Sequence, residues 1–295
     1  MFELQEWAME HRWRVDSETG RLREVLLCPP DHYAWQRTNS IARKTLDEGT
    51  KVPTRTDLVA QYDGLVAALE NAGVVCRYSQ TEAHLPYQVY TRDSSQVTPW
   101  GPVITQLFRP QRRGEYASVI DFYGQADGVW RYSTRGTLEG GDIHIIRPGL
   151  LLVGHSGERT DAAGARQFAD WFEAEGWEVR LQPFPEHFLH LDVLFSMVTP
   201  SLALACREVL DDDLLGWLEA RQIRVIPVSY KDAMTMACNV LALGDDRVIS
   251  AAHATAANAA MKAEGIEVIE LPLDLFTRGG GGVHCMTMPL LRDPL

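Results

Sequence analysis

The chain has 295 residues, of which 45% are hydrophobic and 23% are charged. This balance predicts a globular protein with a sizeable core, built as one large domain or two small ones. The formal net charge of −12 argues against nucleic-acid binding, because an acidic surface repels phosphate groups. The dense basic segment 109–113 is short, and we interpret it as a solvated loop.

The five cysteines form no CxxC pair, and their number is odd. Residues 1–6 are acidic and lack an apolar stretch, so no signal peptide is visible. No run of about 18 apolar residues predicts a membrane span. Together these features predict a cytoplasmic protein with reduced thiols and no membrane association.

The first predicted elements lie in the N-terminal third. A helix over 57–71 places Leu58, Tyr62, Leu65 and Leu69 on one face, at helical spacing. Gly73 follows as a helix terminator, and residues 74–78 are typical of a strand. Residues 96–133 supply a further unit in which no clear helix is visible.

Three fuller copies of one pattern follow, in the order strand, tight turn, strand, helix and returning strand. The predicted strands are 142–146, 150–153, 177–181, 193–198, 202–206, 223–228, 240–243, 247–250 and 266–271, and the predicted helices are 161–175, 211–220 and 253–263. Thr160 is the expected N-cap of the first of these helices.

This repetition predicts four clear modules and one degenerate module around a common core. Mixed strands with helices outside them indicate an α/β array. No Gly/Ser-rich linker interrupts the sequence, so we expect a single domain over residues 1–295.

Four polar clusters stand at predicted strand ends or turns. They are Tyr90-Thr91-Arg92-Asp93-Ser94, Leu138-Glu139-Gly140-Gly141-Asp142, His190-Leu191-Asp192 and Gly282-Val283-His284-Cys285. Each is a weak signal alone, since such sequences also form ordinary turns and surface pairs, and Cys285 alone could be a small packed residue. Cys285 follows four glycines, which let a backbone approach a ligand closely. Jointly the clusters supply a thiol, a histidine and carboxylates.

Such a set suits a planar, cationic electrophile. A guanidinium group pairs bidentately with carboxylates, and its carbon is a poor electrophile because the charge is delocalised. Hydrolysis therefore benefits from a thiolate nucleophile and from a proton donor to the leaving amine. A bound cation would itself favour the thiolate. No cluster shows clean metal-ligand spacing, so no metal or other cofactor is expected.

The order and spelling of the clusters resemble the guanidino-group-modifying superfamily of arginine deiminase, dimethylarginine dimethylaminohydrolase and amidinotransferase. The stretches His284-Cys285-Met286-Thr287-Met288-Pro289-Leu290-Leu291-Arg292-Asp293-Pro294 and His190-Leu191-Asp192-Val193-Leu194-Phe195-Ser196-Met197 look especially like arginine deiminase. The compact length is closer to the dimethylarginine hydrolases. The resemblance implies a five-bladed α/β propeller, the pentein fold, with its site on the axis.

The resemblance also implies roles for particular residues. Cys285 matches the nucleophile, His190 the general acid and base, and Glu139 a carboxylate that assists proton transfer. Asp93 and Asp192 match the pair that clamps the guanidinium, and Asp142 matches a supporting acid. Arg159, and with a looser match Arg109, correspond to arginines that hold the carboxylate of an amino-acid substrate. No metal is used in this superfamily.

The identity of the guanidino substrate stays open at this point. Arginine deiminases carry an arginine in the glycine loop where this chain has Gly280, which puts free arginine in doubt. An amidinotransferase and a non-catalytic guanidino-ligand sensor are the alternatives to a hydrolase, and the oligomeric state, a homodimer included, is not determined. A serine hydrolase is disfavoured because no Gly-x-Ser-x-Gly motif is present.

Overall fold

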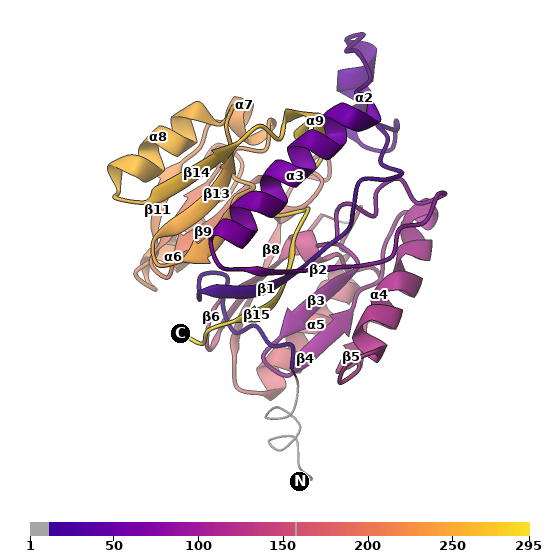
Figure 1. Ribbon diagram of the computed structural model, residues 1–295. Helices are drawn as coiled ribbons and strands as arrows, with labels where there is room; N and C mark the ends of the chain where they lie inside the picture. Colours follow the sequence, from indigo (N-terminus) through magenta and orange to yellow (C-terminus); the bar gives the residue numbers. More distant parts are fainter. Residues whose placement is uncertain (1–11, 157) are drawn as a thin grey trace.

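The computed structural model describes residues 12–156 and 158–295. Residues 1–6, where no signal peptide was expected, and Gly157 therefore lie outside the described residues. Within that part of the chain the strands form five three-stranded sheets with one shared topology. In each sheet a central strand pairs antiparallel with one neighbour and parallel with the other. Helices cover the outer sides of the sheets (Figure 1). The predicted α/β fold of five repeated modules is confirmed.

The bounds of the elements follow the predicted repeat. In the order inner strand, central strand and parallel strand, the sheets are β3 (Ser95–Thr98), β4 (Gly101–Ile104) and β5 (Arg131–Tyr132); β6 (Ile143–Arg147), β7 (Leu150–His155) and β8 (Glu178–Pro183); β9 (Phe195–Thr199), β10 (Leu202–Ala205) and β11 (Arg224–Pro227); β12 (Leu241–Gly244), β13 (Arg247–Ala251) and β14 (Glu267–Leu271); and β15 (Met288–Arg292), β1 (Leu22–Leu27) and β2 (Val75–Tyr78). The long connections carry α3 (Arg55–Asn71), α4 (Tyr116–Gly124), α5 (Ala162–Ala174), α6 (Asp212–Glu219) and α8 (Thr255–Ala263). Shorter segments are α2 (Ser40–Asp47), α7 (Tyr230–Ala233), α9 (Asp274–Thr277) and the 3-10 helices η1 (Pro110–Glu115), η2 (Gly140–Asp142) and η3 (Leu191–Val193).

Local sequence explains where the helices begin. α3 starts with a capping box in which Thr54 and Asp57 each accept a bond from the other's backbone N–H. α5 is capped by Asp161, not by Thr160 as predicted. An Asp side chain serves equally well as an N-cap, and the Thr160 hydroxyl instead accepts a hydrogen bond from the backbone N–H of Glu139, at 3.0 Å. The threonine therefore ties α5 to the site.

The module over residues 96–133 is complete, so its description as degenerate was wrong. It contains β3, β4, β5 and the helix α4. α4 is nine residues long, follows η1 directly and has no side-chain cap. A short helix without a capping residue gives little periodic signal, which is why the sequence pattern concealed it.

The first and last parts of the chain complete one sheet together, because β15 pairs antiparallel with β1. The inner strands β3, β6, β9, β12 and β15 are almost entirely buried. Four of them, β3, β6, β9 and β15, lie just after a residue of the predicted site. The modules thus bring residues far apart in sequence to one region.

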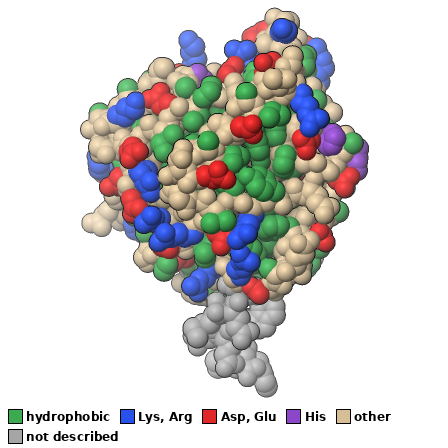
Figure 2. Space-filling model, in the orientation of Figure 1, with side chains coloured by type: hydrophobic (Ala, Val, Ile, Leu, Met, Phe, Trp, Pro, Cys, Tyr) green, Lys and Arg blue, Asp and Glu red, His purple; other side chains and the backbone are tan. Residues whose placement is uncertain are grey.

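The surface agrees with the acidic composition. Figure 2 shows acidic and basic side chains interspersed on the face in view, without a single broad basic area. Among the described residues, no helix has the length and apolar character that crossing a membrane requires.

Packing between modules leads to a test at Gly140. A Cβ at this position would collide with the backbone oxygen of Arg92, whereas a Cβ at Gly64, in α3, would meet no atom within 4 Å. Gly140→Ala should lower the free energy of unfolding by about 1–3 kcal/mol, as overpacking does. Gly64→Ala should leave it unchanged or raise it by up to about 1 kcal/mol. Urea titrations followed by circular dichroism measure both, and equal midpoints would contradict this packing argument.

Candidate active site

The predicted residues converge on one narrow pocket. Its wall contains Thr38, Asn39, Tyr87, Tyr90, Asp93, Arg109, Gln111, Arg112, Arg159, Leu189, His190, Gly280 and Cys285. Glu139, Asp142 and Asp192 lie behind this wall and are completely buried. The cavity measures about 20 Å³, room for one or two water molecules.

The Cys285 thiol lies at the base of the pocket, after the glycine loop. Its Sγ donates a hydrogen bond to Asp192 Oδ2 at 3.2 Å, and Asn239 Nδ2 donates to Sγ at 3.2 Å. Burial raises the pKa of Cys285 well above its ordinary value, and the charges of Asp192 and Asp93 act in the same direction. Without a bound cation the residue is therefore a thiol.

Asn239 is a site residue that the sequence analysis missed. Its Oδ1 accepts hydrogen bonds from the backbone N–H groups of His284, at 2.9 Å, and Cys285, at 3.3 Å. Asn239 thus fixes the loop that carries Cys285 as well as contacting the sulfur. It stands just before β12, as Asp93, Asp142 and Asp192 stand just before other inner strands. Its place in the module was the signal that could have found it.

The glycine loop reaches the pocket in a conformation that suits glycine. Gly280 has a φ of 106°, in the region that L side chains rarely adopt. The side chain of Asn39 packs against it, and Asn39 Nδ2 donates to the carbonyl of Gly279 at 3.0 Å. The arginine found here in arginine deiminases would require a different backbone.

His190 and Glu139 form a buried ion pair beside the thiol. His190 Nε2 lies 2.7 Å from Glu139 Oε2, and Arg159 Nη1 donates to the same oxygen at 2.7 Å. Burial lowers the pKa of His190, but Asp93, Asp142 and Glu139 outweigh it and raise the pKa to about 9. Burial likewise opposes the ionisation of Glu139, yet Arg159 and His190 hold its pKa well below the usual range. At neutral pH the pair is an imidazolium and a carboxylate.

The two aspartates expected to form the clamp each keep one oxygen without a hydrogen bond, although His190 Nδ1 lies 3.7 Å from Asp93 Oδ1 in an ion pair. Among the described residues, Asp93 Oδ1 and Asp192 Oδ1 are buried and accept no hydrogen bond. Their other oxygens are occupied, Asp93 Oδ2 by Arg112 Nη1 at 2.6 Å and Asp192 Oδ2 by Cys285. Two buried carboxylate oxygens that accept no hydrogen bond suit a ligand that donates several N–H groups.

Arg112 corrects the interpretation of segment 109–113 as a solvated loop. Its side chain is buried and donates to both carboxylate oxygens of Glu115 at 2.8 Å, as well as to Asp93. Burial opposes its charge, but Glu115 and Asp93 raise the pKa of Arg112 well above its ordinary value. Arg112, held by its bidentate pair with Glu115, thus orients Asp93. The sequence analysis did not predict this role.

The remaining predicted residues are also placed. Asp142 Oδ1 accepts the backbone N–H of Leu191 at 2.8 Å, which fixes the turn after His190, and burial raises the Asp142 pKa to about 7. Arg109 lies at the pocket wall in an ion pair with Glu158. Arg159 is committed to Glu139, so neither arginine is wholly free.

The fold also assembles two groups of three potential metal ligands that sequence spacing could not show. These are Asp93, Glu139 and His190, and Glu18, His144 and His284, with ligand atoms within 4.8 Å of one another in each group. In the first group Arg112 and Arg159 already pair with the two carboxylates. That group coincides with the pocket residues described above.

Comparison with known proteins places this site in context. A family model described as N,N dimethylarginine dimethylhydrolase, eukaryotic, matches residues 31–292. The uncharacterized protein YkgA of Bacillus subtilis (strain 168) is 30% identical over 96% of both chains. An arginine deiminase of Listeria monocytogenes serotype 4b (strain CLIP80459) is 29% identical, with 72% of this chain covering 62% of that protein's length.

Solved structures of similar fold include ArgZ and AgrE, and both of these proteins are named as arginine dihydrolases. The N-terminal domain of ArgZ, an arginine dihydrolase of cyanobacteria, has a TM-score of 0.79 and 22% identity over 91% of this chain and 97% of that chain. Unliganded AgrE has a TM-score of 0.81 and 23% identity, covering 92% of this chain and 40% of that chain. SxtG, an amidinotransferase from Microseira wollei, has a TM-score of 0.79 and 18% identity, covering 96% and 98%. At these identities the structures show a shared fold.

The family assignment follows from the extent of the family match, which leaves only short segments at either end uncovered. It agrees with the five-sheet architecture and with the order of the polar clusters. This chain belongs to the family described as N,N dimethylarginine dimethylhydrolase, eukaryotic, within the guanidino-modifying superfamily of pentein fold.

Proposed function

We propose that the protein hydrolyses a C–N bond at the guanidinium carbon of a guanidino acid, through a covalent intermediate on Cys285. The family and its relatives support hydrolysis or transfer at guanidino groups in general. One observation carries the hydrolytic proposal. A thiol and an imidazolium line one buried pocket, and two carboxylate oxygens without hydrogen bonds lie at the pocket or just behind its wall.

In the first step, the guanidinium would lie between Asp93 Oδ1 and Asp192 Oδ1. Its charge would stabilise the Cys285 thiolate and so lower a thiol pKa that is otherwise raised. The thiol proton passes to solvent as the cation binds. The thiolate then attacks the guanidinium carbon, and a C–S bond forms as the C–N π bond opens to a tetrahedral adduct. Holding the cation between fixed carboxylates also brings the reacting atoms together, which removes part of the entropic barrier.

In the second step, His190 would donate its proton to the leaving nitrogen as the C–N bond breaks. Ammonia or an alkylamine departs, and an amidino group remains on sulfur. The neutral His190 then accepts a proton from water, whose oxygen attacks the same carbon and displaces the thiolate. The product is a ureido compound. Glu139 stabilises the imidazolium in the states where it is charged.

A screen of purified protein tests this proposal. Arginine, methylated arginines, agmatine and short guanidino acids are incubated separately, and product masses are read. A ureido product with ammonia indicates a deiminase, and release of methylamine or dimethylamine indicates a methylarginine hydrolase. Ornithine formed with loss of the guanidine carbon indicates a dihydrolase. Turnover only when an acceptor amine is added would favour a transferase, and binding without turnover would favour a sensor.

The covalent role of Cys285 gives the first functional prediction. Cys285→Ser should lower kcat by about three orders of magnitude or more, because the nucleophile is lost while the side-chain shape is kept. Cys76→Ser is the matched control, since Cys76 lies in β2 away from the pocket wall. The rates come from product assays. Substantial activity in the Cys285 variant would rule out the covalent mechanism.

The protonation state of His190 gives a second prediction. In the Cys285→Ser protein its imidazole should titrate near pH 9, because carboxylates surround it. Stabilisation by this imidazolium is then complete below its ordinary pKa of 6.5 and is lost as pH rises through 9. Asp93→Asn should move the midpoint toward 6.5, because Asp93 makes the largest charge contribution that raises it.

NMR titration of protein carrying ¹⁵N-labelled histidines measures this midpoint, and His190→Gln identifies the signal. A parent midpoint at the ordinary value would mean that His190 is neutral at physiological pH. That result would contradict the carboxylate surroundings argued for His190 and would leave the imidazolium a minor form at physiological pH.

The carboxylate of the substrate gives a third prediction. Arg109 pairs with Glu158 at the pocket wall, whereas Arg159 pairs with Glu139 inside the site. Arg109→Ala should therefore raise KM for a guanidino acid by about tenfold or more, as loss of a charged hydrogen bond does, and leave agmatine unaffected. Arg159→Ala should impair both substrates, because it also removes the cation beside Glu139. Equal losses for both substrates in the Arg109 variant would argue against a carboxylate contact.

A further inference from the structure

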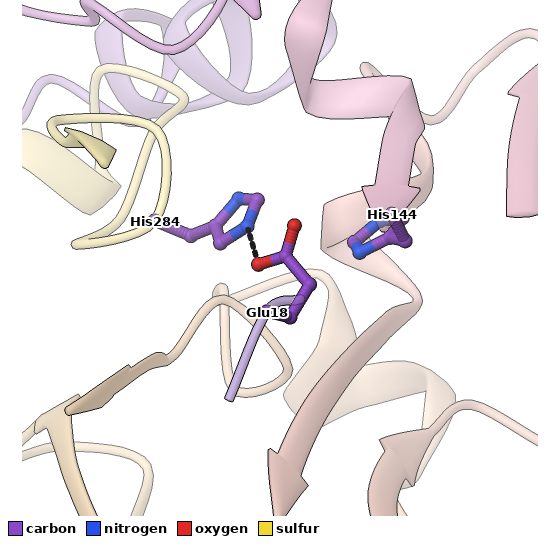
Figure 3. A group of neighbouring side chains, drawn as sticks. All are labelled: Glu18, His144 and His284. Atoms are coloured by element: carbon purple, nitrogen blue, oxygen red, sulfur yellow. Dashed lines mark hydrogen bonds and ion pairs between the residues drawn. The ribbon is translucent and has the colours of Figure 1, made fainter. Parts of the chain in front are cut away.

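A second buried polar cluster lies directly behind the clamp. It consists of Glu18, His144 and His284, which come from the segment before β1, from β6 and from the loop that carries Cys285 (Figure 3). All three side chains are buried. Glu18 stands outside the region that the family model matches, residues 31–292. The mechanism proposed above uses none of the three.

The His284 ring links this cluster to the active site. Its Nδ1 lies 2.9 Å from Asp192 Oδ2, and its Nε2 lies 3.4 Å from Glu18 Oε2. Because each ring nitrogen faces a carboxylate, the imidazole is held at both ends. Asp192 Oδ2 is thereby held, whereas Asp192 Oδ1 accepts no hydrogen bond among the described residues.

Glu18 is itself firmly placed. Its backbone N–H donates to the carbonyl of Ile145 at 2.6 Å, and Arg92 Nη1 lies 3.9 Å from its Oε1. Arg92 also contacts the loop, since its Nε donates to the carbonyl of His284 at 3.3 Å. Burial opposes ionisation of Glu18, but His284 and Arg92 hold its pKa well below the usual range. An ionised carboxylate therefore anchors the far end of the ring.

His144, the third member of the cluster, is uncharged and packs against His284. Its ring stacks on that of His284, with centroids 5.6 Å apart and an interplanar angle of 15°. Burial lowers the pKa of His144 to about 4, so the ring is neutral at physiological pH. It covers the contact between Glu18 and His284, and a low-dielectric cover strengthens the hydrogen bonds beneath it.

The neighbouring charges favour a hydrogen-bonded chain over a metal site. The three side chains have ligand spacing that would suit a cation. However, Arg92 already lies beside Glu18, and the charge of Glu18 acts on Arg292 as well. Two buried guanidinium groups would repel a further divalent charge in a medium that screens poorly.

We propose that Glu18 and His284 are positioning residues that orient Asp192 through the chain Glu18–His284–Asp192. This inference rests on the proposed function, in which Asp192 holds the guanidinium of the substrate. The segment before β1 would thus complete the clamp, although it lies outside the family match.

Binding of guanidinium ion to the Cys285→Ser protein tests the proposal without turnover. The probe is guanidinium chloride far below denaturing concentrations, followed by the shifts of ¹⁵N-labelled histidines. Glu18→Gln and His284→Ala should each weaken binding about tenfold, within the range of coupling between contacting residues. His284→Asn should lose less than His284→Ala, because an Asn amide can replace Nδ1 at Asp192. Asp16→Asn is the matched control on the same segment and should bind like the parent.

The outcomes separate the two proposals. If Asp192→Asn does not weaken guanidinium binding, the clamp of the proposed function is wrong. If Asp192→Asn weakens it while Glu18→Gln and His284→Ala do not, only the positioning chain is overturned. An equal loss in Asp16→Asn, or equal losses in His284→Asn and His284→Ala, would also overturn it. Near-UV circular dichroism verifies the fold of each variant. If Glu18→Gln does not fold, the comparison of His284→Asn with His284→Ala still tests the positioning chain.

Discussion

Compensation of buried negative charge is the constraint on which the whole site depends. Asp93, Glu139 and Asp192 are buried around one thiol, where an unpaired carboxylate would be very costly. Arg112 pairs with Asp93 and Arg159 with Glu139, while His284 Nδ1 and the Cys285 thiol both contact the same oxygen of Asp192. The compensation is incomplete, because one oxygen of Asp93 and one of Asp192 accept no hydrogen bond among the described residues. The proposed cationic substrate would complete it.

The five-module fold makes this arrangement possible. Asp93, Asp142, Asp192, Asn239 and Cys285 each stand shortly before the inner strand of a different sheet. Each module therefore places one polar residue near a common centre. The residue type differs from module to module, so the centre contains several different chemical groups. The outer strands and helices supply the apolar packing that keeps the centre rigid, since positions near a reacting atom tolerate little displacement.

The sequence was most informative where its signals were local. The periodic face of α3 and the β6–α5–β8 unit were predicted almost to their ends, and the polar clusters were predicted to share a site. α4 was missed because it is short and uncapped, and Arg112 was misjudged because its partner Asp93 is 19 positions away. Glu18 and His144 gave no signal at all, because their importance arises from contacts across the fold. Spacing along a chain cannot show which charges will be buried together.

The pairing of β15 with β1 has a consequence for the order in which the protein is made. β1 precedes the strands of the other four modules in the chain, and synthesis is directional. β1 therefore stays without its antiparallel neighbour until those modules have been made. Cys285 lies three residues before β15, so its sulfur arrives together with the strand that completes this sheet. A partly synthesised chain would thus hold the other polar residues of the site without the thiol, and the site would be complete only once β15 pairs with β1.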